Sequence, residues 1–141
     1  MKRLRLKLLG ILVLVLSVCL AFVSGCGSGK LSDDFDEEQI KKATVNVIHL
    51  INRRDSQSLR ELCNEQMKEA LTDNVLGQLY QVIGQGGALQ EMGDITVVGM
   101  TDETSKEELA VAVVKAEYEN KVFTFTVTFT KQMKLAGLYY T

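Results

Sequence analysis

The chain has 141 residues, of which 46% are hydrophobic, with 16 basic and 18 acidic side chains. All 18 acidic residues follow Cys26, whereas four of the basic residues lie within residues 1–7. Residues 26–141 therefore carry 12 basic against 18 acidic side chains, a net charge of −6, which argues against nucleic acid as a partner. The remaining 116 residues are enough for one ordinary domain and exclude a second one.

The first 25 residues have the pattern of an export signal. Residues 1–7 are positively charged, and residues 8–22 form an apolar run shorter than the roughly 20 residues that span a bilayer. Val23, Ser24 and Gly25 then precede a cysteine, and lipoprotein processing requires small side chains next to such a thiol. We therefore predict cleavage between Gly25 and Cys26 and a lipid with palmitate-type acyl chains on Cys26. An uncleaved membrane anchor is the alternative.

A lipid on Cys26 predicts a protein attached to the outer face of the cytoplasmic membrane, with the domain extracytoplasmic. Residues 26–33 are rich in glycine and serine and are predicted to form a flexible tether of roughly 15 Å. Residues 34–141 are predicted to form the domain. Once Cys19 is removed and Cys26 carries lipid, only Cys63 remains, so no disulfide is expected within the exported chain.

A long first helix is predicted to begin at Asp34, which has the spacing of a capping box with Glu37. Apolar side chains then recur every three or four residues and define one buried stripe. The stripe consists of Ile40, Ala43, Thr44, Val47, Leu50 and Ile51. His49 is the only histidine of the chain and lies nearly opposite this stripe, so we predict a surface histidine with no catalytic or metal-binding role. The acidic residues 33–38 lack the spacing of a calcium loop and are predicted to be a solvated helix start.

Two further helices are predicted, a short one capped by Asp55 or Ser56 and a third capped by Thr72 or Asp73. Residues 65–71 are expected to add a helical turn between them. Cys63 falls among leucines and is predicted to be a buried, unreactive thiol. The glycines at positions 84, 86 and 87 are predicted to end the third helix as a cap and hinge, since a phosphate-binding loop would follow a strand.

Four strands are predicted after residue 94, at residues 95–100, 109–119, 122–130 and 135–140. A two-residue hairpin turn, at residues 120–121 or 119–120, places large and small apolar side chains on one face. This face contains Phe123, Phe125, Val127, Phe129, Ala112, Val114, Ala116 and Tyr118. The opposite face carries threonines with Leu109, Val111, Val113 and Val122, which makes it a candidate surface for a homodimer or an envelope protein partner. A partly apolar, unpartnered sheet face is the alternative.

The order of elements predicts an α+β fold with three N-terminal helices packed on a curved, four-stranded antiparallel sheet. From residue 35 onward the chain also resembles small bacterial lipoproteins with a domain of unknown function of the nuclear transport factor 2 (ketosteroid-isomerase-like) superfamily. The resembling segments are residues 71–72, 86–88, 118–120, 123–127 and 134–139. The resemblance implies a cone-shaped fold, and because these residues are structural it implies no mechanism.

Two classes of function are compatible with these patterns. The first is a non-catalytic lipoprotein that binds a small apolar ligand or an envelope protein; the second, by analogy of fold, is a small isomerase- or dehydratase-like enzyme that uses the cone pocket. We favour the first, because no carboxylate or histidine is expected inside the cone beside an oxyanion donor. We predict no catalytic residue, metal site or cofactor. If a pocket exists, its expected lining is Val47, Ile51, Tyr80, Tyr118, Phe125 and Phe129.

Overall fold

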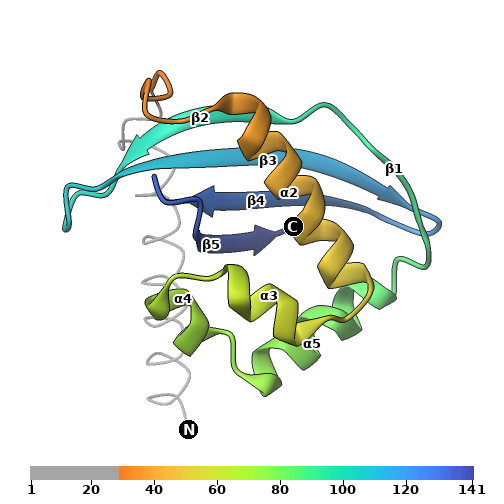
Figure 1. Ribbon diagram of the computed structural model, residues 1–141. Coiled ribbons are helices and arrows are strands. Elements are labelled where there is room, and N and C mark those ends of the chain that lie inside the picture. The colour runs from red at the N-terminus through yellow and green to blue at the C-terminus, as the bar shows by residue number, and fades with distance from the viewer. Residues whose placement is uncertain (1–28) are drawn as a thin grey trace, which may run out of the picture.

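The computed structural model describes residues 29–141, so the predicted signal, the cleavage site and Cys26 lie outside the described residues. Within this range the chain forms four helices and an antiparallel sheet of five strands (Figure 1). The helices are α2 (Glu37–Asn52), α3 (Ser56–Leu62), α4 (Glu65–Ala70) and α5 (Asp73–Gly84). The strands are β1 (Leu89–Met92), β2 (Thr96–Thr101), β3 (Glu108–Tyr118), β4 (Val122–Phe129) and β5 (Leu135–Tyr140). The α+β class is confirmed.

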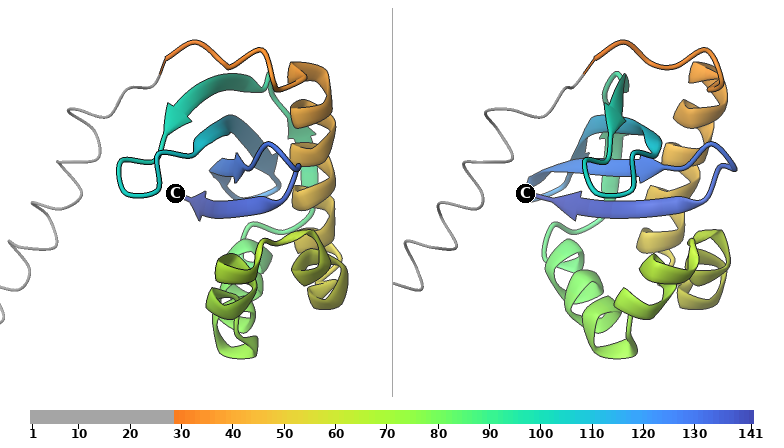
Figure 2. Two further views of the ribbon diagram at one scale, coloured as in Figure 1. Left: turned by 60° about the vertical axis from the view of Figure 1, so that its left-hand side comes forward. Right: turned by 90° about the vertical axis from the view of Figure 1, so that its left-hand side faces the viewer.

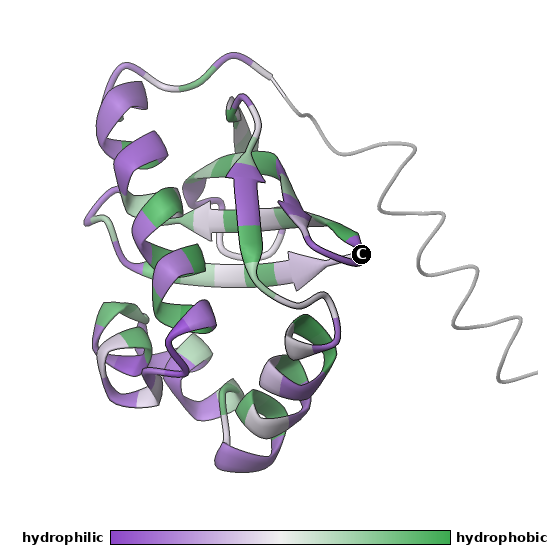
Figure 3. Cartoon of the chain, turned by 90° about the vertical axis from the view of Figure 1, so that its right-hand side faces the viewer, coloured by the Kyte–Doolittle hydropathy of each residue, from purple (hydrophilic) through white to green (hydrophobic). Residues whose placement is uncertain are grey.

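Helix α2 begins two residues later than predicted. Its N-cap is Asp36, whose carboxylate accepts hydrogen bonds from the backbone N–H groups of Glu38 and Gln39, at 3.0 and 3.3 Å. The predicted cap, Asp34, instead pairs with Lys131, with 2.7 Å between the carboxylate and the ammonium group. The apolar stripe is present, and Figure 3 shows hydrophobic and hydrophilic residues alternating along this helix, as expected of an amphipathic one.

Four helices are present instead of the predicted three, because the chain between α3 and α5 is broken at Cys63. Cys63 has an extended backbone with φ −76° and ψ 149°, so α3 cannot continue through it. The next residue, Asn64, starts a separate helix by accepting a hydrogen bond from the N–H of Met67 at 2.8 Å. Asp55 and Thr72 cap α3 and α5, as predicted.

The central strand of the sheet is β3, which pairs with β4 on one side and with both β1 and β2, in succession, on the other. Strand β5 pairs with the outer side of β4 and forms an edge. Strand β1 was not predicted, and the predicted number of four strands is therefore wrong. This strand has only four residues, of which the middle two are exposed, and its pairing with β3 is irregular, so it has no alternating pattern.

The predicted hairpin between β3 and β4 is confirmed. Glu117 pairs with Val122, and the N–H of Tyr118 donates to the carbonyl oxygen of Lys121 at 2.8 Å, so the turn is formed by residues 119 and 120. This register brings the alanines of β3 opposite the aromatic residues of β4, since Ala116 pairs with Phe123. Every residue of the predicted apolar face is buried.

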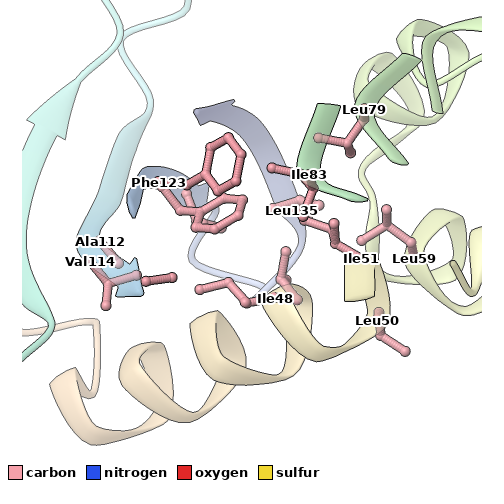
Figure 4. Packing of buried hydrophobic residues seen from close by; sticks show 14 of the residues in the cluster. Ile48, Leu50, Ile51, Leu59, Leu79, Ile83, Ala112, Val114, Phe123 and Leu135 are labelled. Carbon is pink, nitrogen blue, oxygen red and sulfur yellow. The ribbon is translucent and has the colours of Figure 1, made fainter. Parts of the chain in front are cut away.

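The helices and the sheet enclose one core. Figures 1 and 2 show α2 crossing one face of the twisted sheet, with α3, α4 and α5 grouped beyond its C-terminal end. We call the face that α2 covers the inner face and the opposite one the outer face. Side chains of the inner face interdigitate with Ile48 and Ile51 of α2 and with Leu79 and Ile83 of α5 (Figure 4). None of the helices described here is long and apolar enough to cross a membrane.

Candidate functional site

The inner face is filled by side chains where it meets α2. Phe125 is fully buried and Phe129 is 2% exposed, and both belong to the core cluster together with Val47. The ring of Phe123 packs edge-on against that of Tyr118, with 5.3 Å between the centroids (Figure 4 shows the surrounding core). Three of the residues predicted to line a pocket therefore lie in dense apolar packing.

Two other residues from that prediction, Ile51 and Tyr80, lie around a small hollow at the C-terminal end of α2. The hollow has a volume of about 100 Å³ and is completed by Asn52, Arg54, Ile83, Gly84 and Gly87. The Tyr80 hydroxyl lies 2.9 Å from the Ser56 hydroxyl, so it already has a hydrogen-bond partner. This volume is well below the roughly 300–1,000 Å³ of ordinary ligand pockets, so the hollow has room only for water-sized molecules.

The last predicted pocket residue, Tyr118, has an unusual environment. It is 5% exposed, and its hydroxyl makes no hydrogen bond of good geometry with the described residues. Burial raises the pKa of the Tyr118 hydroxyl, and the nearby side-chain amide of Asn52 partly opposes this shift. A buried hydroxyl without a partner destabilises the fold, and this tyrosine stays protonated at neutral pH.

A larger hollow lies at the other end of the inner face, beside residues 29–35, which we call the N-terminal segment. Its volume is about 490 Å³ and it is open to solvent. Leu31, Phe35 and Val97 provide its apolar lining, and the charged residues Lys30, Asp33 and Glu37 stand around it. An open hollow with charged residues on several sides differs from the enclosed, mostly apolar pocket that the sequence predicted.

The candidate reactive residues lie apart from these hollows. His49 is exposed, as its helical position predicts. Cys63 is 3% exposed, its thiol donates to the carbonyl oxygen of Leu59 at 3.3 Å, and burial raises its pKa. The prediction of a buried thiol is confirmed, and its raised pKa makes it a poor nucleophile at neutral pH. Within residues 29–141 there is no group of three or more His, Cys, Asp or Glu side chains that could hold a metal ion.

The outer face of the sheet has a different character from these sites. The strand registers place on it a mixture of β-branched, aliphatic and threonine side chains. Its members are Thr96, Val98, Met100, Leu109, Val111, Val113, Val122, Thr124, Thr126, Thr128 and Tyr139. Tyr139 is 71% exposed and Val122 is 51% exposed, the two most exposed of the large hydrophobic side chains within residues 29–141. The predicted candidate surface therefore exists as a continuous sheet face, and β2 and β5 extend it.

The edge of strand β5 also offers backbone hydrogen-bonding groups next to this surface. This edge was not predicted from the sequence. Thr124 and Thr141 exchange two backbone hydrogen bonds of 2.9 and 3.0 Å, so by antiparallel alternation the N–H and C=O groups of Leu138 and Tyr140 point away from β4. At the beginning of the strand, the N–H of Asn64 donates to Leu135 at 2.9 Å. No local pattern of β5 could have found this edge, because the position of a strand within a sheet depends on the strands it pairs with.

Comparison with known proteins identifies the family but no activity. A family model described as "Protein of unknown function (DUF3887)" matches residues 44–138. The chain belongs to the DUF3887 family. No match is found among curated proteins. The DUF3887 chain is also similar to a solved structure described as "NMR structure of protein from Ruminococcus gnavus ATCC 29149", with a TM-score of 0.70 and 17% identity. That similarity covers 79% of this chain and 96% of the other one, and it supports the fold alone.

Proposed function

We propose that this DUF3887 protein is a lipid-anchored, extracytoplasmic lipoprotein that binds a protein partner through the outer face of its sheet and catalyses no reaction. The proposal includes the lipid on Cys26 and a cone fold related to nuclear transport factor 2. A long helix crossing a twisted antiparallel sheet supports the latter relationship.

The observation that carries the proposal is that the outer face presents several apolar side chains among its threonines, while α2 packs on the inner face. Val98, Met100, Val111 and Val113 are half-buried by their neighbours within the sheet, yet they are not part of the core cluster or among the residues packed against it. An apolar sheet face without a covering layer is typical of a protein interaction surface. Aromatic side chains such as that of Tyr139 are also enriched in such interfaces.

The distribution of charged side chains supports the outer face as an interaction surface. The central positions of the outer face are valine and threonine, and charged side chains such as Lys115, Glu117 and Glu91 stand toward the β1 end. Interfaces commonly have an uncharged centre and a polar rim, because burying an unpaired charge is costly. A second copy of this chain and another envelope protein are equally compatible with an interface of this kind.

The binding of a small apolar ligand is less well supported. The aromatic core fills the inner face, and the open hollow beside the N-terminal segment carries charged side chains. The enzymatic alternative requires a proton-transferring group facing a substrate. His49 is exposed on α2, and Tyr118 is surrounded by core side chains.

Photo-crosslinking of the full chain in its membrane tests the proposal. A benzophenone side chain placed at Tyr139 is expected to give an adduct of one defined mass, either twice that of the chain or the chain plus one other protein. The same probe at Val75, an exposed hydrophobic residue of α5, is the matched control and is expected to give none. Equal labelling from both positions, or none from Tyr139, contradicts the proposed surface.

A further inference from the structure

The N-terminal segment is held against the domain from its first described residue. Gly29 and Gly99 exchange two backbone hydrogen bonds, each of 2.9 Å, which adds a short antiparallel bridge to the free edge of β2. A Cβ atom at Gly99 would overlap the carbonyl oxygen of Lys30, so the close approach of the two backbones requires glycine at this position.

The rest of the segment is fixed by side chains. Leu31 and Phe35 pack against the core cluster. Lys131 forms ion pairs with Asp34 at 2.7 Å and with Glu108 at 2.6 Å, joining the segment to the beginning of β3 and the end of β4. Five of the eight residues of the predicted tether, residues 29–33, therefore follow the domain surface, and residues 26–28 lie outside the described part of the chain.

The bridge limits how far the domain can move from a lipid on Cys26. Three residue steps separate Cys26 from Gly29, and a fully extended chain spans at most about 10 Å over this length. The bridge is antiparallel, so the chain reaches Gly29 from the side of Thr101, where the turn between β2 and β3 begins. The turn between β4 and β5 lies at the same end, because Lys131 pairs with Glu108 (Figure 1).

We infer that the domain sits directly on the bilayer, with the end of the sheet that carries the β2–β3 turn facing the lipid headgroups. The hairpin at residues 119–120 and helix α5 then face away from the membrane. The outer face is directed sideways, toward proteins anchored in the same membrane. This inference rests on the lipid anchor of the proposed function. The β2–β3 turn, residues 102–107, has three acidic side chains and one basic one, so this turn adds no attraction to anionic lipids beyond the covalent chain.

The geometry is tested by energy transfer on the full chain in phosphatidylcholine vesicles that contain a headgroup-labelled acceptor lipid. One donor dye is attached at Lys106→Cys, in the β2–β3 turn, and in a separate sample at Gln78→Cys, on α5, both exposed positions. The buried Cys63 is replaced by alanine in both. We expect transfer from position 106 to be several-fold more efficient than from position 78, at low and at high salt.

One variant and one further measurement identify the cause of that difference. Insertion of 20 Gly/Ser residues between Gly27 and Ser28 is expected to reduce the difference in transfer efficiency strongly, because the longer linker no longer restricts the distance between the domain and the membrane. Mass spectrometry of the same samples reports the lipid on Cys26. A lipidated chain with equal transfer at both positions overturns the orientation alone. An unlipidated Cys26 overturns the proposed anchor, and with it the orientation.

Discussion

The two faces of the sheet share valine residues but differ in burial. On β3, the inner residues Ala112 and Val114 are 0% and 1% exposed, whereas the adjacent outer residues Val111 and Val113 are only half-buried. Valine occurs on both faces, so hydrophobicity alone does not distinguish them. The difference in burial arises because α2 and α5 pack on one face. Alternation along a strand therefore assigns each residue to a face, whereas the layer packed against the sheet determines which face is buried.

Truncation of a large side chain on each face is expected to give the largest contrast. Phe125→Ala removes a fully buried ring and is expected to lower the free energy of unfolding by about 3–5 kcal/mol. Tyr139→Ala, on the outer face, is expected to change it by less than about 0.5 kcal/mol. Urea denaturation followed by circular dichroism measures both. Similar losses for the two variants would mean that the outer face is covered within the domain.

The same substitution at two adjacent positions sharpens the comparison. Val114→Thr places a hydroxyl in the core and is expected to cost about 1–3 kcal/mol, whereas Val113→Thr adds one to a face already rich in threonine and is expected to cost less than about 0.5 kcal/mol. Urea midpoints of the two variants provide the measurement. A larger cost at Val113 than at Val114 contradicts the observed register.

A pair of glycines tests the place where the backbone of the N-terminal segment, instead of a side chain, packs on β2. Gly99→Ala is expected to destabilise the fold by about 1–3 kcal/mol because the new methyl group displaces Lys30. Gly77→Ala is the control: it lies in α5 with open space around it and is expected to stabilise the helix by about 0.5–1 kcal/mol. Thermal unfolding distinguishes the two, and equal effects would show that the bridge to Gly29 is absent.

Removal of the unpartnered hydroxyl from the inner face is expected to have a small and opposite effect. Tyr118→Phe keeps the ring that packs on Phe123 and deletes a buried oxygen without a good hydrogen bond, so stability is expected to stay the same or rise by up to about 1 kcal/mol. Chemical denaturation provides the measurement. A clear loss of stability would show that the hydroxyl has a partner, such as a water molecule shared with Asn52.

The smallest effect is expected at the exposed ion pairs of the N-terminal segment, and it depends on pH. The hydrogen bond and charge of Lys131 lower the pKa of Glu108 in the folded protein, so this contribution to stability is present above the ordinary glutamate pKa and lost as pH falls through the folded value. Lys131→Met is expected to raise the pKa of Glu108 toward its ordinary value. A carboxyl titration by NMR checks this, and an unchanged titration contradicts the ion pair.

Much of the fold was predictable because its determinants are local. The helix caps at Asp55 and Thr72 and the alternation of β4 are short-range patterns, and the two-residue hairpin fixed the register of β3. Strand β1 was not predictable, since its pairing depends on β3 and its own residues do not alternate. The N-cap of α2 was predicted at the wrong residue because several neighbouring aspartates have the spacing of a cap. Asp34 instead pairs with Lys131, which lies 97 residues away in sequence.

The candidate surfaces were predictable only in part, because only some of their determinants are local in sequence. The outer face followed from the hairpin register, and the exposed His49 followed from helical geometry. The bridge between Gly29 and Gly99 joins two glycines in unrelated contexts and leaves no periodic signal. The filled interior also depends on how helices and sheet approach each other, which no single segment encodes.

The bridge between Gly29 and Gly99 has a consequence for the order of folding. The β3–β4 hairpin closes a loop of two residues, whereas the bridge closes a loop of about 70 residues and has a higher entropic cost of closure. The hairpin is therefore expected to form early and the bridge late. Gly29 precedes Gly99 by 70 residues, so the N-terminal segment has no edge to pair with until β2 has formed. The N-terminal segment is therefore expected to close onto the domain as one of the final steps of folding.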